Sequence, residues 1–313
     1  MIFTVTLNPA IDKVLFLEKF QRSRTNRLSR TLETIGGKGT HVSINLKLLG
    51  VHSTALGIAF GEQGRKIAMM FRDCGQDSSF LHYDVPGTES RTNYEIVEES
   101  GPVCTMLAER GPTLPRKITE DLLNQIKGLL KPGDMLVLTG DASNVEDTSI
   151  YSKLSLAANG LGARVFLDAS GPYLKEGLGS PPFLIKPNLE ELSFLAEKDL
   201  KTETDITGAL QHLSTLKIAM IAMTWGENGA IVMDGQDVYR VKPMEVETIN
   251  EGGCGDAFLS AIVAGVEMNL GITDTLRLAS AVAAAAAESA STVGFDPLRA
   301  EQLKAQAVVT RMR

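Results

Sequence analysis

The chain has 313 residues, 43% of them hydrophobic and 22% charged, which is enough to bury a full α/β core without a disulfide or a metal. Its 31 basic and 38 acidic residues give a formal net charge of −7 with no basic run, which argues against a nucleic-acid partner. Three widely spaced cysteines and no signal-peptide pattern favour the cytoplasm, and the apolar stretch 279–287 is too short to span a membrane.

The first part of the chain predicts a strand, a turn and then the strands of a lid. Asp12 follows the first strand and can bind sugar hydroxyls, although an aspartate that only stabilises the turn is an equally good interpretation. Residues 12–35 and about 88–109 alternate polar and apolar side chains without helical period, which predicts a small, exposed antiparallel sheet. Such a sheet beside a larger α/β body is typical of a lid. We expect residues 1–313 to form one domain that includes this lid, because no linker interrupts them.

Glycines gather between the first lid segment and the helical run 42–49, in Gly36-Gly37-Lys38-Gly39. They let the backbone approach a ligand closely, and the start of a helix favours an anion. The motif is not a P-loop, because GxxxxGK[ST] is absent; a plain strand-to-helix turn explains two of the glycines but not the whole motif. In the second lid segment, Arg91 can bind a phosphate through two parallel hydrogen bonds, although most surface arginines are simply solvated.

From about residue 133 onward, short apolar runs alternate with helical segments. Runs without polar alternation, separated by helices, are typical of a parallel sheet covered on both faces. The later runs, IAMIAMT, AIVMD and DVYRV, follow one another more closely. The fold class is therefore α/β, a doubly wound, mainly parallel sheet with helices on both faces.

Lys186 ends one of these strands and precedes a helix that begins near Asn188 and Glu191. Asn188 and Glu191 are three residues apart in the first helical turn and can hold the water shell of Mg²⁺. An asparagine cap on a charged helix start explains the same residues without a metal. Lys186 is placed to reach a nucleotide phosphate.

The strongest local feature is the sequence NEGGCGD at residues 250–256, directly before a helix. Its glycines allow consecutive backbone N–H groups to face an anion at the helix N-terminus. Asp256, beside those groups, can accept the proton of an attacking hydroxyl. A glycine loop with Asp256 as an ordinary helix cap is the alternative.

Seven motifs in order make the chain resemble the PfkB (ribokinase-like) carbohydrate kinases over nearly its whole length, in the 1-phosphofructokinase and tagatose-6-phosphate kinase branch. They are TLNPAID at 6–12, GGKG at 36–39, SRTN at 90–93, LDASG at 167–171, IKPNLEEL at 185–192, TWGENGA at 224–230 and NEGGCGDAF at 250–258. Two positions depart from the family pattern: His41 stands where GGKGxN has asparagine, and residues 140–144 replace a GSLPPG-like turn.

The resemblance implies a role for each site residue. Asp256 would be the base, and the amides of Gly253, Cys254 and Gly255 would stabilise the transferring phosphoryl group. The implied sugar-phosphate residues are Asp12, Gly36, Gly37, Lys38, His41 and Arg91; the nucleotide residues are Lys186, Thr224, Gly226 and Gly229; and the residues for Mg²⁺, through water, are Asn188 and Glu191.

The implied activity is ATP- and Mg²⁺-dependent phosphorylation of a ketohexose phosphate, with fructose 1-phosphate as the first choice. Tagatose 6-phosphate, a neutral sugar or a nucleoside are alternative acceptors, and an inert sugar-phosphate sensor is the alternative from another class. The lid strands of this family often pair between subunits, so a homodimer is expected. No nucleic-acid or membrane partner is expected.

Overall fold

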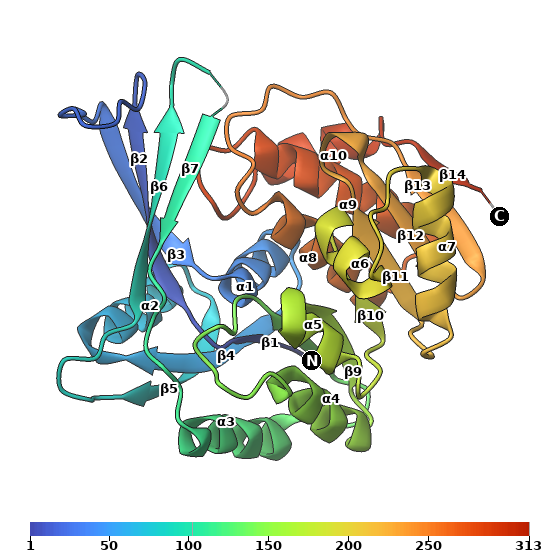
Figure 1. The fold of residues 1–313 in the computed structure, drawn as a ribbon, viewed down its shortest axis with the longest axis horizontal. Coiled ribbons are helices and arrows are strands. Elements are labelled where there is room, and N and C mark those ends of the chain that lie inside the picture. Colours follow the sequence, from blue (N-terminus) through green and yellow to red (C-terminus); the bar gives the residue numbers. More distant parts are fainter. Residues whose placement is uncertain (102, 313) are drawn as a thin grey trace.

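The computed structural model describes residues 1–101 and 103–312 (Figure 1). Its strands are β1 (Ile2–Thr6), β2 (Ala10–Leu17), β3 (Arg30–Gly36), β4 (Ser53–Phe60), β5 (Asp77–Tyr83), β6 (Arg91–Glu98), β7 (Val103–Ala108), β8 (Met135–Thr139), β9 (Arg164–Asp168), β10 (Leu184–Ile185), β11 (Met220–Thr224), β12 (Ala230–Asp234), β13 (Asp237–Val241) and β14 (Val309–Arg311). Its α-helices are α1 (Lys38–Leu48), α2 (Gly61–Asp73), α3 (Arg116–Leu129), α4 (Ile150–Gly160), α5 (Gly171–Gly177), α6 (Leu189–Ala196), α7 (Glu203–Ser214), α8 (Cys254–Glu267), α9 (Ile272–Ala287) and α10 (Pro297–Lys304).

The larger sheet has the strand order β14-β13-β12-β11-β10-β9-β8-β1-β4-β5. From β11 to β5 every neighbouring pair is parallel, which confirms the mainly parallel sheet predicted from the apolar runs. From β11 to β14 the pairs are antiparallel. The connections from β11 to β13 are too short for a crossover helix, so these strands can only turn back as hairpins.

Different helices cover the two faces of this sheet, because successive side chains of a strand point to opposite faces. Along β8, Leu136 and Leu138 join the core under α3 to α7, whereas Met135 and Val137 join the core that α8, α9 and α10 share with α1. Helix α2 packs beside α1 on the second face, where Ile67 and Phe71 contact Ala55 of β4. This is the predicted doubly wound arrangement.

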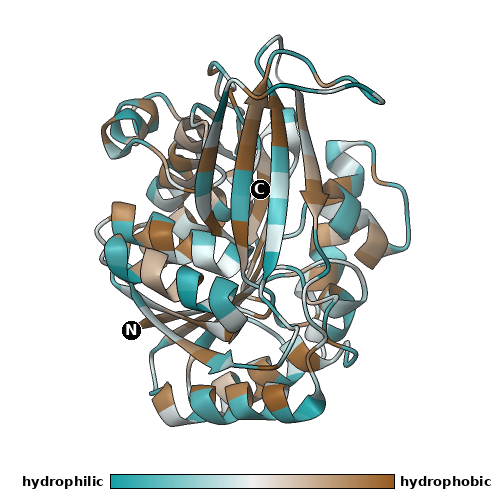
Figure 2. Cartoon of the chain, turned by 90° about the vertical axis from the view of Figure 1, so that its left-hand side faces the viewer, coloured by the Kyte–Doolittle hydropathy of each residue, from teal (hydrophilic) through white to brown (hydrophobic). Residues whose placement is uncertain are grey.

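The lid is a separate sheet with the order β3-β2-β6-β7, which stands beside the main body in Figure 1. Seen from outside in Figure 2, its strands carry bands of both hydrophobic and hydrophilic residues, as the predicted alternation requires. The two outer pairings are antiparallel, as predicted, but the central pair β2–β6 is parallel. The reason is topological: between β2 and β6 the chain passes through β3, α1, β4, α2 and β5, a connection long enough to return in the same direction.

The parallel strands bring several functional side chains to one edge of the large sheet. Asp168 ends β9, Lys186 directly follows β10, and Thr224 ends β11. Ligands of doubly wound sheets bind outside the carboxyl ends of the strands, so this edge, facing the lid, is where a site is expected. Within the described residues, no helix is both long and apolar enough to cross a membrane.

Candidate active site

The N-terminus of α8 forms a backbone turn that only glycine can make. Gly253 caps the helix with φ 79°, and a Cβ at this position would lie 2.0 Å from the carbonyl oxygen of Thr292. The first N–H groups of a helix lack partners inside it, and none of the hydrogen bonds among the described residues uses the Gly255 amide. The Cys254 amide makes only a long bond of 3.4 Å to Glu251. Asp256 lies in the same first turn and is 5% exposed.

Cys254 contributes to this turn through its backbone. Burial, with Glu251 and Asp256 nearby, raises the pKa of its thiol to about 12. The thiol is therefore protonated at neutral pH and is not a nucleophile.

His41, from α1, lies between two carboxylates of different elements. Its Nδ1 is 2.8 Å from Asp256 Oδ2, and its Nε2 is 3.1 Å from the carbonyl oxygen of Ile35 and 3.6 Å from Asp12 Oδ2. Burial alone would lower the pKa of His41, but Asp12 and Asp256 raise it to about 10. The structure thus joins three residues that the sequence analysis assigned to two roles, sugar binding and base catalysis.

Asp12, from β2, is held by the neighbouring strand β6 and by a distant loop. Its Oδ1 accepts a hydrogen bond of 2.8 Å from Asn93 Nδ2, and its Oδ2 accepts one of 3.2 Å from Thr292 Oγ1. Burial opposes ionisation, but His41 and these hydrogen bonds hold the pKa of Asp12 below its ordinary value. Residue 36 must be glycine because a Cβ there would lie 2.0 Å from Asp12 Oδ1.

Two lysines converge on Asp168 at the end of β9. Lys186 Nζ lies 3.3 Å from Asp168 Oδ2, and Lys38 Nζ lies 3.4 Å from Oδ1. Asp168 raises the pKa of Lys38, so this lysine is a cation at neutral pH. Lys186 Nζ is also 3.4 Å from where a Cβ of Gly255 would stand. A phosphoryl group at the α8 N-terminus would therefore meet backbone N–H groups and a buried cation together.

Asp168→Asn is expected to lower the free energy of unfolding by about 3 kcal/mol at pH 7, because it leaves the buried Lys186 ammonium without its counter-charge. Burial alone would raise the pKa of Asp168, but the two lysines hold it below its ordinary value. The ion pairs therefore stabilise the fold at every pH above the ordinary pKa of an aspartate, and this stabilisation is lost as the pH falls into the acid range. Unfolding in urea measures the free energy of unfolding of the wild type and the variant.

Asp199→Asn is the control, since Asp199 and Lys201 pair at 2.9 Å but are 75% and 76% exposed. Equal losses in the two variants would contradict the account.

Asn188 and Glu191 form a capping box at the start of α6. Asn188 Oδ1 accepts from the Glu191 amide at 2.8 Å, and Glu191 Oε2 accepts from the Asn188 amide at 2.9 Å. Glu191 Oε1 accepts from Ser170 Oγ at 2.5 Å. The structure therefore shows the cap that was the alternative interpretation, and a metal here would contact Glu191 through water. No cluster of three or more metal-ligating side chains occurs among the described residues.

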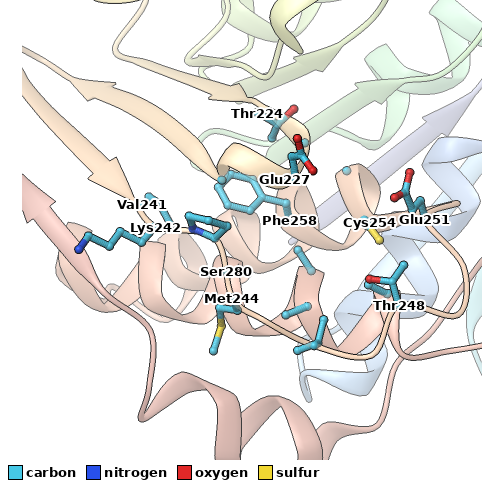
Figure 3. Close-up of a pocket in the computed structure, with 18 of the residues that line it drawn as sticks. Thr224, Glu227, Val241, Lys242, Met244, Thr248, Glu251, Cys254, Phe258 and Ser280 are labelled. Atoms are coloured by element: carbon cyan, nitrogen blue, oxygen red, sulfur yellow. The ribbon is translucent and has the colours of Figure 1, made fainter. Parts of the chain in front are cut away.

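A cavity of about 750 Å³ opens beside the α8 N-terminus (Figure 3). Three residues predicted to bind nucleotide, Thr224, Gly226 and Gly229, line it together with Cys254 and Gly255. Its remaining walls come from the segment 241–248 and from α8 and α9. The apolar side chains among them are Val241, Pro243, Met244, Val246, Phe258, Ala283, Ala284 and Ala287. A flat, apolar base fits such walls, and a phosphate chain could extend to Gly255.

Arg91 is not a solvated surface arginine, because it is only 8% exposed at the start of β6. It donates from Nε to the Asn8 carbonyl at 3.1 Å and from Nη1 to the Glu109 carbonyl at 3.2 Å. Its Nη1 also lies 3.2 Å from Asp141 Oδ2, in the loop after β8 that departs from the family turn. The predicted phosphate-binding arginine is thus partly neutralised by an internal carboxylate.

Residues 5–298 match the profile of the pfkB family carbohydrate kinases. The chain belongs to this family. It is a sugar kinase, a phosphotransferase with an alcohol acceptor.

Individual pfkB relatives are similar to the chain over most of its length. The 1-phosphofructokinase of Bacillus subtilis is 30% identical over 100% of both chains, and the tagatose-6-phosphate kinase of Staphylococcus epidermidis is 30% identical over 85% of both. Phosphofructokinase-2 from Escherichia coli, solved with potassium, has the same fold with a TM-score of 0.90 at 23% identity over 97% of this chain and 98% of that one. A possible 1-phosphofructokinase from Thermotoga maritima has a TM-score of 0.88 at 26% identity over 100% and 99%.

Several residues of this pfkB site were not found by sequence reasoning. Asp168, Asn93 and Thr292 hold the lysines and Asp12 in place, and Asp141 faces Arg91. The sequence did carry a signal for Asp168, because this residue ends a buried strand within the LDASG motif. Lys186, which was predicted, carries the same signal because it directly follows the next strand. Thr292 gave none, because it meets Asp12 across 280 residues of sequence.

Proposed function

We propose that this kinase transfers the γ-phosphoryl group of ATP to a ketohexose phosphate, with fructose 1-phosphate as acceptor and fructose 1,6-bisphosphate as product. One observation carries the proposal: the cavity that suits a nucleotide reaches Gly255, next to the buried carboxylate of Asp256. A nucleotide phosphate and a deprotonating group would then meet at one helix N-terminus.

In the proposed reaction, Asp256 accepts the proton of the acceptor hydroxyl. The hydroxyl oxygen attacks the γ-phosphorus of ATP, and ADP leaves. Charge then spreads over the equatorial oxygens of the phosphoryl group. The amides of Gly253 to Gly255 and the ammonium of Lys186 would stabilise that charge from fixed positions. Lys38, Asp12, His41 and Gly36 to Gly37 would form the sugar side of the site.

PfkB sugar kinases generally use ATP with Mg²⁺. The residues present fit a water-bridged ion, because both oxygens of Glu191 already accept hydrogen bonds and Mg²⁺ keeps several of its waters. Asn188 and Glu191 would hold these waters, and bound Mg²⁺ would neutralise phosphate charge. Asn188 also lines the nucleotide cavity, which supports this placement.

The acceptor is inferred from the relatives. The full-length similarity to a 1-phosphofructokinase favours fructose 1-phosphate, and the shorter similarity to a tagatose-6-phosphate kinase makes tagatose 6-phosphate the next choice. A coupled ADP-release assay with Mg²⁺·ATP would compare fructose 1-phosphate, tagatose 6-phosphate, fructose 6-phosphate and unphosphorylated fructose. We expect the highest kcat/KM for fructose 1-phosphate; preference for unphosphorylated fructose would overturn the assignment.

A neutral sugar is the second candidate because Asp141 sits against Arg91, where an acceptor phosphate would bind. A carboxylate at this point accepts hydrogen bonds from hydroxyls but repels a phosphate. An inert sensor is less well supported, since the chain retains Asp256 and the Gly253 turn.

Arg91→Ala is expected to raise KM for the phosphorylated sugar by about tenfold or more while KM for ATP stays within about twofold, because a charge-assisted contact is lost on the sugar side only. Steady-state kinetics with each substrate varied in turn measures both constants. Arg116→Ala is the control, since Arg116 is 91% exposed and pairs with Glu120 on α3. An unchanged KM for the sugar phosphate would remove Arg91 from the site.

A homodimer through the lid remains a prediction. Strands β3 and β7 are the edges of the lid sheet, and Leu32, Met106 and Leu107 are exposed on them. Unpaired edges with exposed apolar side chains favour pairing with a second copy. The cytoplasmic location and the single-domain organisation of residues 1–313 also remain predictions.

A further inference from the structure

We propose that His41 is a positioning residue for phosphoryl transfer: as a cation it holds the base Asp256 and the sugar-binding Asp12 side by side, and it leaves one oxygen of Asp256 free for the acceptor hydroxyl. This role rests on the proposed function of Asp256 and Asp12. It differs from direct contact with the sugar, which the family resemblance implied for position 41.

The hydrogen-bonding partners of the imidazole fix its protons. Nε2 lies 3.1 Å from the Ile35 carbonyl oxygen, which can only accept, so Nε2 must carry a hydrogen. Nδ1 lies 2.8 Å from Asp256 Oδ2, so a single proton is shared between that nitrogen and the carboxylate. Either His41 is an imidazolium and Asp256 is ionised, or His41 is neutral and Asp256 is a protonated acid that cannot serve as a base.

The surrounding charges select the first arrangement. Asp256 from α8 and Asp12 from β2 are the titratable groups that contact the ring, and both favour a cation there. The contact from β3 is the Ile35 carbonyl oxygen, which lies against the His41 ring. The loop at Thr292 does not contribute a charge, since it holds Asp12 through a hydroxyl. Lys38, one helical turn away on α1, pairs with Asp168. With neutral His41, Asp256 would be an uncharged acid and the buried carboxylate of Asp12 would have no cation beside it.

This arrangement assigns the two oxygens of Asp256 to different tasks. Oδ2 accepts from His41, whereas no hydrogen bond among the described residues engages Oδ1. On the other side of the ring, both oxygens of Asp12 already accept hydrogen bonds, from Asn93 and Thr292. We therefore infer that Oδ1 of Asp256 takes the proton of the acceptor hydroxyl.

The charge of His41 can be tested without any substrate. The ring-nitrogen NMR shifts of the four histidines, with His41→Gln to assign the signal, should show His41 doubly protonated from pH 6 to 8.5 in the wild-type enzyme. In Asp12→Asn the same signal should titrate at lower pH, because one counter-charge is gone. A neutral His41 ring at pH 7.5 in the wild type would overturn the proposal.

The effect on catalysis is tested by pH profiles of kcat/KM for His41→Asn and His41→Leu. We expect the acid limb to move about one pH unit upward in both variants, since the neighbouring cation no longer favours the ionised base. We expect kcat to fall ~100-fold in His41→Leu and less in His41→Asn, which still donates to Asp256. An unmoved acid limb would mean a structural role only and would overturn the proposal, whatever happens to kcat.

His52→Asn is the matched control. His52 Nε2 pairs with Asp77 at 2.9 Å, but the two side chains are 61% and 66% exposed and remote from the site. Its profile should match that of the wild type. If the wild-type enzyme phosphorylates no sugar at all, the proposed function fails, while the NMR titration still decides the charge of His41.

Discussion

Asp256→Asn is expected to lower kcat by roughly 10³-fold while the Kd for the sugar phosphate changes by less than about threefold. The side chain is nearly isosteric, so the hydrogen bond from His41 at 2.8 Å can be kept through the amide oxygen. What is lost is the ability to take a proton from the acceptor hydroxyl. Rapid-quench kinetics with saturating ATP measures kcat, and calorimetric titration of the sugar phosphate measures binding.

The matched control for this variant is Asp274→Asn. Asp274 also lies in the first turn of a helix, α9, but it pairs with Arg277 and is 60% exposed. It should retain full activity. A kcat for Asp256→Asn within fivefold of wild type would show that another group is the base.

Gly253→Ala is expected to lower kcat by ~100-fold or more, because the turn that presents the amides cannot form around a Cβ. The added carbon would lie 2.0 Å from the backbone oxygen of Thr292, and φ 79° is unfavourable for alanine. Either the loop at Thr292 or the start of α8 must then move. The Kd for ADP, which has no γ-phosphate, should change little. Its adenine contacts the walls of the cavity and not the turn at Gly253.

Two other glycines separate the effect of the turn from the effect of strain. Gly235→Ala places alanine at φ 58° with nothing within 4 Å, in the turn between β12 and β13, so it carries the strain without touching the site. Gly255→Ala keeps the backbone amide, and its new Cβ meets only the flexible end of Lys186 at 3.4 Å. The fall in kcat for this variant should therefore lie between those of the other two. Similar kcat values for Gly253→Ala and Gly235→Ala would contradict the role of the turn.

The fold was largely predictable because the apolar runs after residue 133 carry the pattern of a doubly covered parallel sheet, and the structure confirms it. The lid was predicted from alternation in residues 12–35 and 88–109, within which β2, β3, β6 and β7 lie almost entirely. Its parallel central pair was not predicted. Alternation reports which side chains face outward, but the direction of a neighbouring strand depends on the path of the chain between them.

Sequence reasoning could propose site residues where one short segment carries the chemistry, as in residues 250–256, and the catalytic role of that segment stays a prediction. The site was not predictable where the chemistry depends on distant partners. Arg91 meets Asp141 only when β6 packs against the loop after β8. His41 lies between Asp12 and Asp256 only when α1, β2 and α8 meet. Asn188 and Glu191 show the opposite case, since the local spacing that suggested a metal also encodes the capping box seen in the structure.

The most direct test of the central claim is a crystal structure of the enzyme with Mg²⁺, a non-hydrolysable ATP analogue and fructose 1-phosphate. The account predicts that the terminal phosphate lies within about 3 Å of the Gly255 amide, with the acceptor hydroxyl between it and Asp256 Oδ1. A terminal phosphate directed away from the start of α8, or an acceptor hydroxyl out of reach of Asp256, would contradict it.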